Sequence, residues 1–442
     1  MAAGKQESDR TTVIVEVLRD AFAPLMRADP AAFRAKYRKM ARDPHAFYRG
    51  TACLFCHDVT SEPDPHGWAQ HGSERIWIHG DLHVENFGTY LNSDGRLVFD
   101  INDFDEAYVG RFTWDLQRFA ASLALVAWQK ALPEDAIRKL VARYVRSYLA
   151  QVNHYVASDT DDDFELTLDT AEGPVLVALE EARAMRRADL LDSMTLMQRG
   201  SRSFSDDAST RRLPREERAE VVAAFRAYLD TIPESKRFDR ALFYELRDVV
   251  GKSGFGIGSA GLPAYSVLVE GYSQALDNDV VLSMKQANVP ALSRFVDTSE
   301  VDAYFDHEGH RTVVSQRALQ VHTDPLLGHT SIGGVGYVVS EVSPYEVDLD
   351  WSEINEPADM RSVVDLLGRA TAKIHCASDE DSQQDLVDFQ VEEAIARSLE
   401  GRRNDFVTWL CDWGIAYAER VRADHALFVD AFREGQVGIA AT

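Results

Sequence analysis

The stretch from residue 75 to residue 105 restricts the possible folds more than any other part of the chain. It opens with a short apolar run, RIWIH at 75–79, which predicts a strand. Two further extended segments, 87–91 and 96–101, flank Asn-Ser-Asp-Gly, and Asp-Gly between such segments is a hairpin turn signature. The sequence therefore predicts a strand, a polar loop and a hairpin in direct succession.

Polar side chains gather on this loop and at the far end of the hairpin. Asp81 and Asn86 are five positions apart on the loop, and Asp103 follows the second hairpin strand. Phosphoryl transfer from ATP needs a carboxylate near the attacking hydroxyl and oxygen ligands for Mg²⁺. We expect Asp81 to be the catalytic base and Asn86 and Asp103 to hold the metal. Asp105 and Glu106 could assist, although spare carboxylates there are more often at the surface.

A metal-dependent hydrolase is an alternative, because His79, Asp81 and His83 alternate as H-x-D-x-H. No further histidine cluster completes such a site nearby in the sequence. We therefore expect His79 and His83 to hold the loop through hydrogen bonds. A nucleotide-binding regulator without turnover is a further alternative.

A glycine-rich segment, Gly256-Ile-Gly-Ser-Ala-Gly261, lies far downstream and matches G-x-G-x-x-G. A dinucleotide-binding fold would continue this string as a helix. Here Pro263 follows two residues later and the next run, AYSVLVEG, alternates like a strand. A loop between two strands suits a flap over phosphates. Gly256, Gly258, Ser259 and Gly261 are its candidate phosphate-binding residues.

A third strand, VVLSMK at 280–285, ends in Lys285, whose ammonium could neutralise the α- and β-phosphates. The sequence leaves open which residue orients this lysine. Three candidates lie in a helix expected within 299–322, namely Glu300, Glu308 and Gln316. Glu341 to Ser343 are expected to form a hinge strand whose backbone holds the adenine.

The segments HGDLHVEN, DFDEA and WDL resemble the catalytic loop, metal-binding segment and following helix of aminoglycoside phosphotransferases and related kinase-like enzymes. The longer stretch from KYRKMARDPHAFYRG to TWDLQRFAASL resembles a bacterial family of uncharacterised kinase-like proteins, the domain of unknown function numbered 2252. The resemblance is strongest over about residues 36–125. It implies a kinase-like fold but no particular substrate.

Arg49 lies in Phe47-Tyr-Arg-Gly50, which matches the F-x-R-G motif of that family. The match implies a role in binding phosphate or substrate. An equally good explanation is that Arg49 pairs with a core carboxylate such as Asp115.

The order of the parts is reversed relative to ordinary kinases, because Lys285 lies about 200 residues after Asp81. Residues 365–375, DLLGRATAKIH, resemble the helix that directly precedes the catalytic loop in aminoglycoside-type kinases. A circular permutation accounts for both observations. We therefore predict an α+β, bilobal, circularly permuted protein-kinase-like fold with a small β-rich nucleotide lobe and a large helical lobe.

Three parts follow from this prediction. Residues 1–240 carry the catalytic loop in the helical lobe, with helical insertions. Residues 241–345 form the β-rich part with the glycine loop and the lysine. Residues 346–442 complete the large lobe, since apolar residues recur there with helical spacing.

The composition limits the partners. Lys+Arg 47 against Asp+Glu 72 gives a net charge of −25, which argues against binding nucleic acid or an anionic membrane. A small-molecule substrate is expected, and a cationic one would suit the charge, although acidic surfaces more often serve only solubility. The N-terminal sequence has no apolar signal region and no apolar run is long enough for a membrane span, so we expect a cytoplasmic protein. Nothing indicates an oligomeric state.

Cys53, Cys56 and His57 match the haem-attachment pattern C-x-x-C-H. Such attachment belongs to exported proteins, and the remaining cysteines stand alone in the sequence, which leaves the pattern short of a zinc set. We expect Cys53 and Cys56 to be a buried, reduced, structural pair. The cofactors predicted from the sequence are therefore ATP and Mg²⁺ alone.

Overall fold

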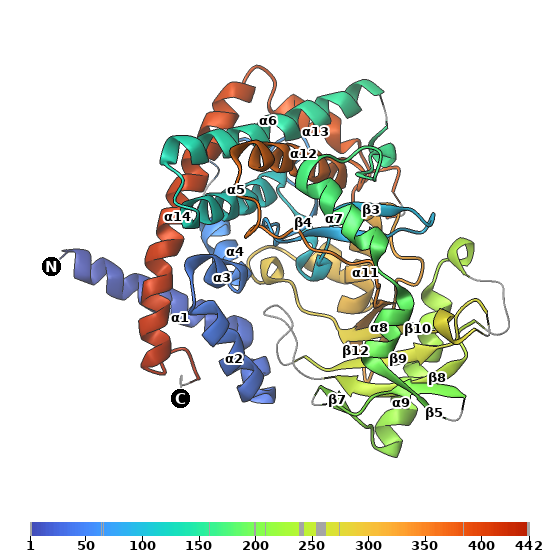
Figure 1. Ribbon diagram of the computed structural model, residues 1–442. Helices are drawn as coiled ribbons and strands as arrows, with labels where there is room; N and C mark the ends of the chain where they lie inside the picture. Colours follow the sequence, from blue (N-terminus) through green and yellow to red (C-terminus); the bar gives the residue numbers. More distant parts are fainter. Residues whose placement is uncertain are drawn as a thin grey trace.

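The computed structural model describes residues 2–439 except residues 63, 65, 159, 199, 208, 238–242, 253–261, 274 and 383. Within these ranges the chain forms a mixed α+β structure, with helices concentrated on one side and the largest sheet on the other (Figure 1). None of the described helices is long and apolar enough to cross a membrane.

The largest sheet is antiparallel, and its six described strands lie in the order β11-β12-β10-β9-β8-β7. Their bounds are β7 Thr210–Arg211, β8 Leu246–Lys252, β9 Ala264–Val269, β10 Val280–Gln286, β11 Gly328–Ile332 and β12 Val335–Glu341. Side chains of β9 are buried on both faces, Val267 and Val269 in one apolar cluster and Leu268 in another. Such two-sided burial explains why this strand reads as a near-continuous apolar run.

Each face of this sheet is covered by elements that precede β8 in the sequence. Helix α9 (Arg215–Tyr228) contributes Phe225 and Tyr228 to the cluster that contains Val267. Helix α8 (Arg187–Met194) and the hairpin β5 (Thr195–Gln198) and β6 (Ser201–Phe204) cover the opposite face, through Leu191 and Phe204.

Residues 187–228 therefore pack with the sheet, whereas the sequence analysis placed everything up to residue 240 in the helical lobe. The β-rich part begins earlier than residue 241. Strands β6 and β7, which the sequence analysis did not predict, lie in this part of the chain. The sequence pattern of the β5–β6 hairpin is weak, because its strands are short and three of the four β5 residues are exposed.

The helical part has a single large apolar core that runs from Ile14 to Ile439. Its helices before the sheet are α1 Ala2–Ala28, α2 Pro30–Met40, α3 Pro44–Arg49, α4 Ala52–Ser61, α5 Phe112–Gln129, α6 Glu134–Ser158 and α7 Gly173–Ala184. Those after it are α12 Pro357–Cys376, α13 Val391–Ser398 and α14 Arg403–Arg433. Helices α6 and α12 pack against each other, as Figure 1 shows, and α14 packs along α5 and α1.

The strand, loop and hairpin predicted from the sequence are confirmed. Strand β1 is Ile76–Ile78 and pairs with β4, Tyr108–Gly110. The hairpin consists of β2 Phe87–Leu91 and β3 Leu97–Ile101. A short 3₁₀ turn, η1 at Phe104–Glu106, follows it.

Two helices and one extended segment connect the sheet to this hairpin. Helices α10 (Ser299–Tyr304) and α11 (Glu308–Gln320) follow β10, and α11 packs against β11 and β12. After β12, the chain runs beside β2, where Thr89 N–H donates to Val347 O at 3.0 Å. The extended segment therefore leads directly from the sheet to the edge of the predicted catalytic hairpin.

All four cysteines are buried and free. The prediction of a buried, reduced pair at Cys53 and Cys56 is confirmed. Burial also raises the pKa of the Cys53 thiol to about 12, so this cysteine stays protonated and unreactive at neutral pH.

Candidate active site

A cavity of about 520 Å³ lies between the sheet and the β2–β3 hairpin. Its walls come from the loop after β1, from β10, α11 and β12, and from the segment that follows β12. Every sequence-predicted site residue that the structure describes lines it, namely Arg49, Asp81, Asn86, Asp103, Lys285 and Glu341. Gly256, Gly258, Ser259 and Gly261 lie outside the described residues.

Asp81 is held in position by an arginine that the sequence analysis did not select. Arg118, on α5, is wholly buried and donates to Asp81 Oδ1 through Nε at 2.7 Å, and its Nη2 lies 2.5 Å from the same oxygen in an ion pair. Nη2 of Arg118 also donates to the Tyr48 carbonyl at 2.8 Å, and its guanidinium stacks 3.8 Å from the centre of the Tyr48 ring. These contacts engage Oδ1, whereas Oδ2 makes no hydrogen bond within the described residues, and Asp81 lines the cavity.

Asn86 closes the same loop. Its Nδ2 donates to the Asp81 carbonyl at 2.9 Å, and its backbone N–H donates to the His83 carbonyl at 3.0 Å. The amide nitrogen is thereby used within the loop, so Oδ1 is the atom that Asn86 can offer to a cation.

The two loop histidines make hydrogen bonds, as expected from the sequence. His79 Nε2 lies 2.9 Å from the Asn102 carbonyl, and His83 Nδ1 accepts from the Glu85 N–H at 3.3 Å. Burial lowers the pKa of His83 well below its ordinary value, so its ring is neutral. Among the described residues, no group of three or more His, Cys, Asp or Glu side chains is arranged to hold a metal.

Asp115 anchors the start of the loop. Its carboxylate accepts from the backbone N–H of His79 at 2.6 Å and of Gly80 at 2.9 Å. His375, on α12, reaches the same carboxylate through Nε2 at 3.1 Å, while its Nδ1 lies 2.9 Å from Tyr148 Oη. The α12 helix therefore holds the start of the loop through Asp115.

Asp115 is consequently not the partner of Arg49, which corrects one alternative from the sequence. Arg49 instead forms an ion pair with Glu85, and both side chains are about one-third exposed at the cavity wall. The Arg49 Nε atom is buried and has no partner. The pairing leaves Arg49 in the cavity rather than in the core.

Gly80 is the point of closest backbone approach in the loop. Its φ is +79°, and a Cβ atom there would lie 2.2 Å from the Glu106 carbonyl oxygen. Only glycine satisfies both the left-handed backbone and the contact with η1.

Asp103 projects into the cavity from a left-handed backbone with φ of +60°. A non-glycine residue with this φ is uncommon and is typical of functional sites. The side chain is open to the cavity, but surrounding protein atoms and the nearby charges of Asp105 and Asp81 raise the pKa of Asp103 above its ordinary value. A cation beside Asp103 would relieve this repulsion.

Lys285 faces Asp103 across the cavity, and their charges favour each other. No carboxylate of the described residues lies within the ion-pair distance of 4 Å from its ammonium. Of the three candidate partners, Glu300 pairs with Arg75 and Glu308 with Arg311, so neither orients Lys285. Gln316 lines the same cavity as Lys285.

Glu346 is a second carboxylate whose pKa is affected by the Lys285 charge, although the sequence analysis did not select it. Protein atoms around its side chain raise the pKa of Glu346, and the Lys285 charge opposes that rise. Glu346 lies on the segment after β12, 61 positions beyond Lys285, where no motif marks it. Sequence spacing alone offered no signal for it or for Arg118.

Glu341 lies in the cavity wall, but its polar groups are used internally. Its side chain pairs with Arg187 of α8, and its backbone N–H donates to Asp324 Oδ2 at 2.7 Å. The next N–H, of Val342, donates to the Val281 carbonyl at 2.8 Å. Neither N–H can hold an adenine in this arrangement, which narrows the expected hinge to the residues around Ser343.

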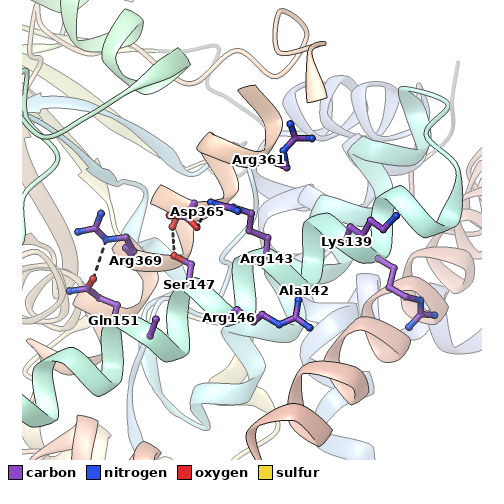
Figure 2. A pocket seen from close by; sticks show the side chains of 11 residues that line it. Lys139, Ala142, Arg143, Arg146, Ser147, Gln151, Arg361, Asp365 and Arg369 are labelled. Carbon is purple, nitrogen blue, oxygen red and sulfur yellow. Dashed lines mark hydrogen bonds and ion pairs between the residues drawn. The ribbon is translucent and has the colours of Figure 1, made fainter. Parts of the chain in front are cut away.

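A second large groove, of about 760 Å³, lies between α6 and α12. Figure 2 shows its basic side chains, among them Arg143, Arg146 and Arg361. Several of its cations already have partners, as in the 3.0 Å ion pair between Arg143 and Asp365. None of the sequence-predicted site residues lines this groove, so we place the active site in the cavity beside the hairpin.

A family model described as "Uncharacterized protein conserved in bacteria (DUF2252)" matches residues 27–431. No curated protein and no solved structure matches the chain.

Proposed function

The chain belongs to the DUF2252 family of uncharacterised bacterial proteins, and we propose that it is an ATP- and Mg²⁺-dependent phosphotransferase. Its acceptor is a hydroxyl or similar group of a small molecule. The observation that carries this proposal is that one cavity unites Asp81, Asn86, Asp103 and Lys285. These are the base, the metal ligands and the phosphate-binding cation that phosphoryl transfer requires.

Asp81 supplies the base in this proposal. As the acceptor oxygen bonds to the γ-phosphorus and the bond from that phosphorus to ADP breaks, the hydroxyl proton passes to Asp81 Oδ2. The contacts of Arg118 with Oδ1 hold the carboxylate in one orientation during that transfer. A side chain held in position to accept the proton raises the rate roughly 10²–10⁴-fold.

The residues present fit a magnesium ion. Asp103 is a carboxylate with a raised pKa and Asn86 offers a carbonyl oxygen, and both line the cavity. Magnesium is usually held by one or two carboxylates together with substrate phosphates, rather than by a cluster of protein ligands. When bound there, it would neutralise charge on the phosphates.

The arrangement of the sheet supports a kinase-like nucleotide lobe. Strands β8, β9 and β10 form an antiparallel meander, Lys285 is on the third of them, and a helix, α11, follows before the last two strands. Kinases likewise carry the phosphate-binding lysine on a third strand ahead of a helix. The contact of His375 with Asp115 supports the permuted order, because it joins the end of the chain to the loop near its beginning.

A nucleotide-binding regulator without turnover is the second candidate. It is favoured by Gln316, because kinases use a glutamate on the corresponding helix to orient their lysine. In this chain the cavity side of α11 presents Thr312, Gln316 and Gln320, none of which is charged.

Two measurements test these proposals. Thermal melting of the full chain with ATP should show stabilisation that depends on Mg²⁺, because bound ligand shifts the unfolding equilibrium. A panel of hydroxylated metabolites, analysed by mass spectrometry, should then show one that gains a phosphoryl group. Binding without any transfer would favour the regulator, and no binding of nucleotide would refute both.

A further inference from the structure

A smaller cavity adjoins the proposed active site, and Lys285 is not among the residues that line it. Its volume is about 60 Å³, and it shares Arg49, Asp81, Asp103 and Asp105 with the larger cavity. Its remaining walls come from α1, α2, α4 and the residues that follow β10. The two cavities therefore meet at the proposed base and at the proposed metal ligand.

Lys36, on α2, lies in the wall of this smaller cavity and has no anionic partner. Its side chain is only 4% exposed, and within the described residues it makes no ion pair or hydrogen bond. Its ammonium lies 3.9 Å from the centre of the Phe22 ring. Burial lowers the pKa of Lys36 to about 8, although the carboxylates of Glu106 and Asp81 oppose this fall. Burying an ammonium group without a counterion costs free energy, unless a bound anion supplies the missing negative charge.

Arg294 stands at the mouth of the same cavity. Its guanidinium makes only two long contacts, both at 3.3 Å, to the backbone carbonyls of Asp20 and Ala21. It is exposed and has no carboxylate partner within the described part of the chain. Arg294 and Lys36 are thus two cations that line one cavity and form no ion pair within the described residues.

Of the acidic side chains that line this cavity, Asp103 and Asp105 lie where it meets the larger cavity, whereas Glu106 and Asp81 already have hydrogen-bond donors. Glu106 accepts from Asn288 Nδ2 at 3.0 Å and from the backbone N–H of Ala291. Asp81 accepts from Arg118. Of the charged side chains that line the smaller cavity alone, Glu106 is hydrogen-bonded, whereas Lys36 and Arg294 have no counterion within the described residues.

We propose that this cavity binds an oxyanionic group, a carboxylate or a phosphate, of the molecule that accepts the phosphoryl group, through Lys36 and Arg294. A space of about 60 Å³ holds about four waters, which is the size of one such group and not of a nucleotide. The acceptor is then a small hydroxylated anion, whose hydroxyl lies at Asp81 while its charged end lies at Lys36. This assignment of substrate class rests on the proposed phosphotransferase function.

Calorimetric titration of the full chain with inorganic phosphate and, separately, with acetate tests the site directly. Lys36→Met should weaken binding of the oxyanion about 10- to 100-fold, the worth of a hydrogen bond to a charged group. Arg294→Gln should weaken it as well. Lys139→Met, at an exposed surface lysine, should leave it unchanged. Tighter phosphate would indicate a phosphorylated acceptor and tighter acetate a hydroxy acid.

The outcomes that overturn the site are equally definite. Absence of binding by both anions refutes it, as does equal loss in Lys36→Met and Lys139→Met. Loss in Lys285→Ala, but not in Lys36→Met or Arg294→Gln, would place the anion on the nucleotide side instead. If Lys36→Met does not fold, Arg294→Gln at the mouth decides the question.

Nucleotide binding separates this inference from the function on which it rests. If Mg²⁺-dependent ATP binding occurs and Lys36→Met leaves anion binding intact, the oxyanion site fails and the phosphotransferase proposal stands. If the anion binds through Lys36 but no nucleotide binds, the site stands and the phosphotransferase proposal fails.

Discussion

Asp81 combines a structural contact and a proposed chemical role in one side chain. Its Oδ1 is the charge partner of a wholly buried arginine, while the carboxyl as a whole remains 16% exposed to the cavity. Buried guanidinium groups require a partner, since an uncompensated buried charge costs about 3–5 kcal/mol. The same pairing that stabilises α5 against the loop therefore holds the base in position.

Asp81→Asn should lower phosphoryl transfer by roughly 10²–10⁴-fold, because an amide cannot accept the hydroxyl proton. Affinity for ATP with Mg²⁺ should change little, since Asp81 is not expected to contact the nucleotide. The melting temperature should fall, because Arg118 loses its charged partner. Turnover and nucleotide affinity are therefore measured well below the melting point, and full activity there would exclude Asp81 as the base.

Asp103 should make stability depend on pH. Its pKa is raised above the ordinary value of 3.8 in the folded chain, so the folded state keeps a proton that the unfolded chain has already released. The free energy of unfolding should therefore fall as pH rises from the ordinary pKa of an aspartate to the raised pKa of Asp103. The fall is measured relative to Asp103→Asn, in which the titrating group is absent. Comparing chemical denaturation of the two proteins cancels the contributions of the histidines.

Mg²⁺ supplies the second half of that experiment. Added at a pH above the raised pKa, the ion should stabilise the unsubstituted chain with ATP and have much less effect on Asp103→Asn. Asn86→Ala should show a milder loss of Mg²⁺ dependence, because a neutral ligand contributes less than a charged one. Equal Mg²⁺ dependence in all three proteins would remove both residues from the metal site.

At the scale of elements, the loop after β1 depends on a close contact with η1. Gly80→Ala should destabilise the chain and reduce transfer, because the new Cβ would meet the Glu106 carbonyl at 2.2 Å. Gly95→Ala is the matched control, since its φ of +75° is similar but no atom lies within 4 Å of the added Cβ. Both variants carry the cost of a left-handed alanine, about 1 kcal/mol or more.

The difference between these two variants, measured by chemical denaturation and by turnover, isolates the contact from the backbone strain. Gly80→Ala should be the more destabilised, and only Gly80→Ala should lose turnover. If the two lose equal stability and both keep their activity, the loop does not need its contact with η1.

The same elements show what the sequence could predict. The hairpin at 87–101 follows a local pattern of turn residues between extended segments, and this prediction is confirmed. Hairpin β5–β6 was not predicted, because its strands are short and three of the four β5 residues are exposed. Arg118 and Glu346 act through contacts between distant segments, and local spacing carries no information about such contacts.

At the scale of the molecule, the cavity joins halves of the chain that are far apart in sequence. Lys285→Ala should weaken ATP binding or turnover about 10- to 100-fold, because a hydrogen bond to a charged group contributes about 1.5–3 kcal/mol. Lys139→Ala, at a surface lysine 75% exposed, controls for the loss of a positive charge. Unchanged nucleotide affinity and turnover in Lys285→Ala would contradict the permuted arrangement.

The attachment of the loop to α12 also orders events during protein synthesis. His375 and Lys373 bind Asp115 and Asp100, which precede them by 260 and 273 residues. At a translation rate of about 5–20 residues per second, the ribosome makes α12 roughly 15–50 s after the loop. The nascent chain must carry this loop without its anchor throughout that interval. We therefore expect the first half of the chain to depend on chaperones, and catalytic competence to arise only after the last quarter has been synthesised.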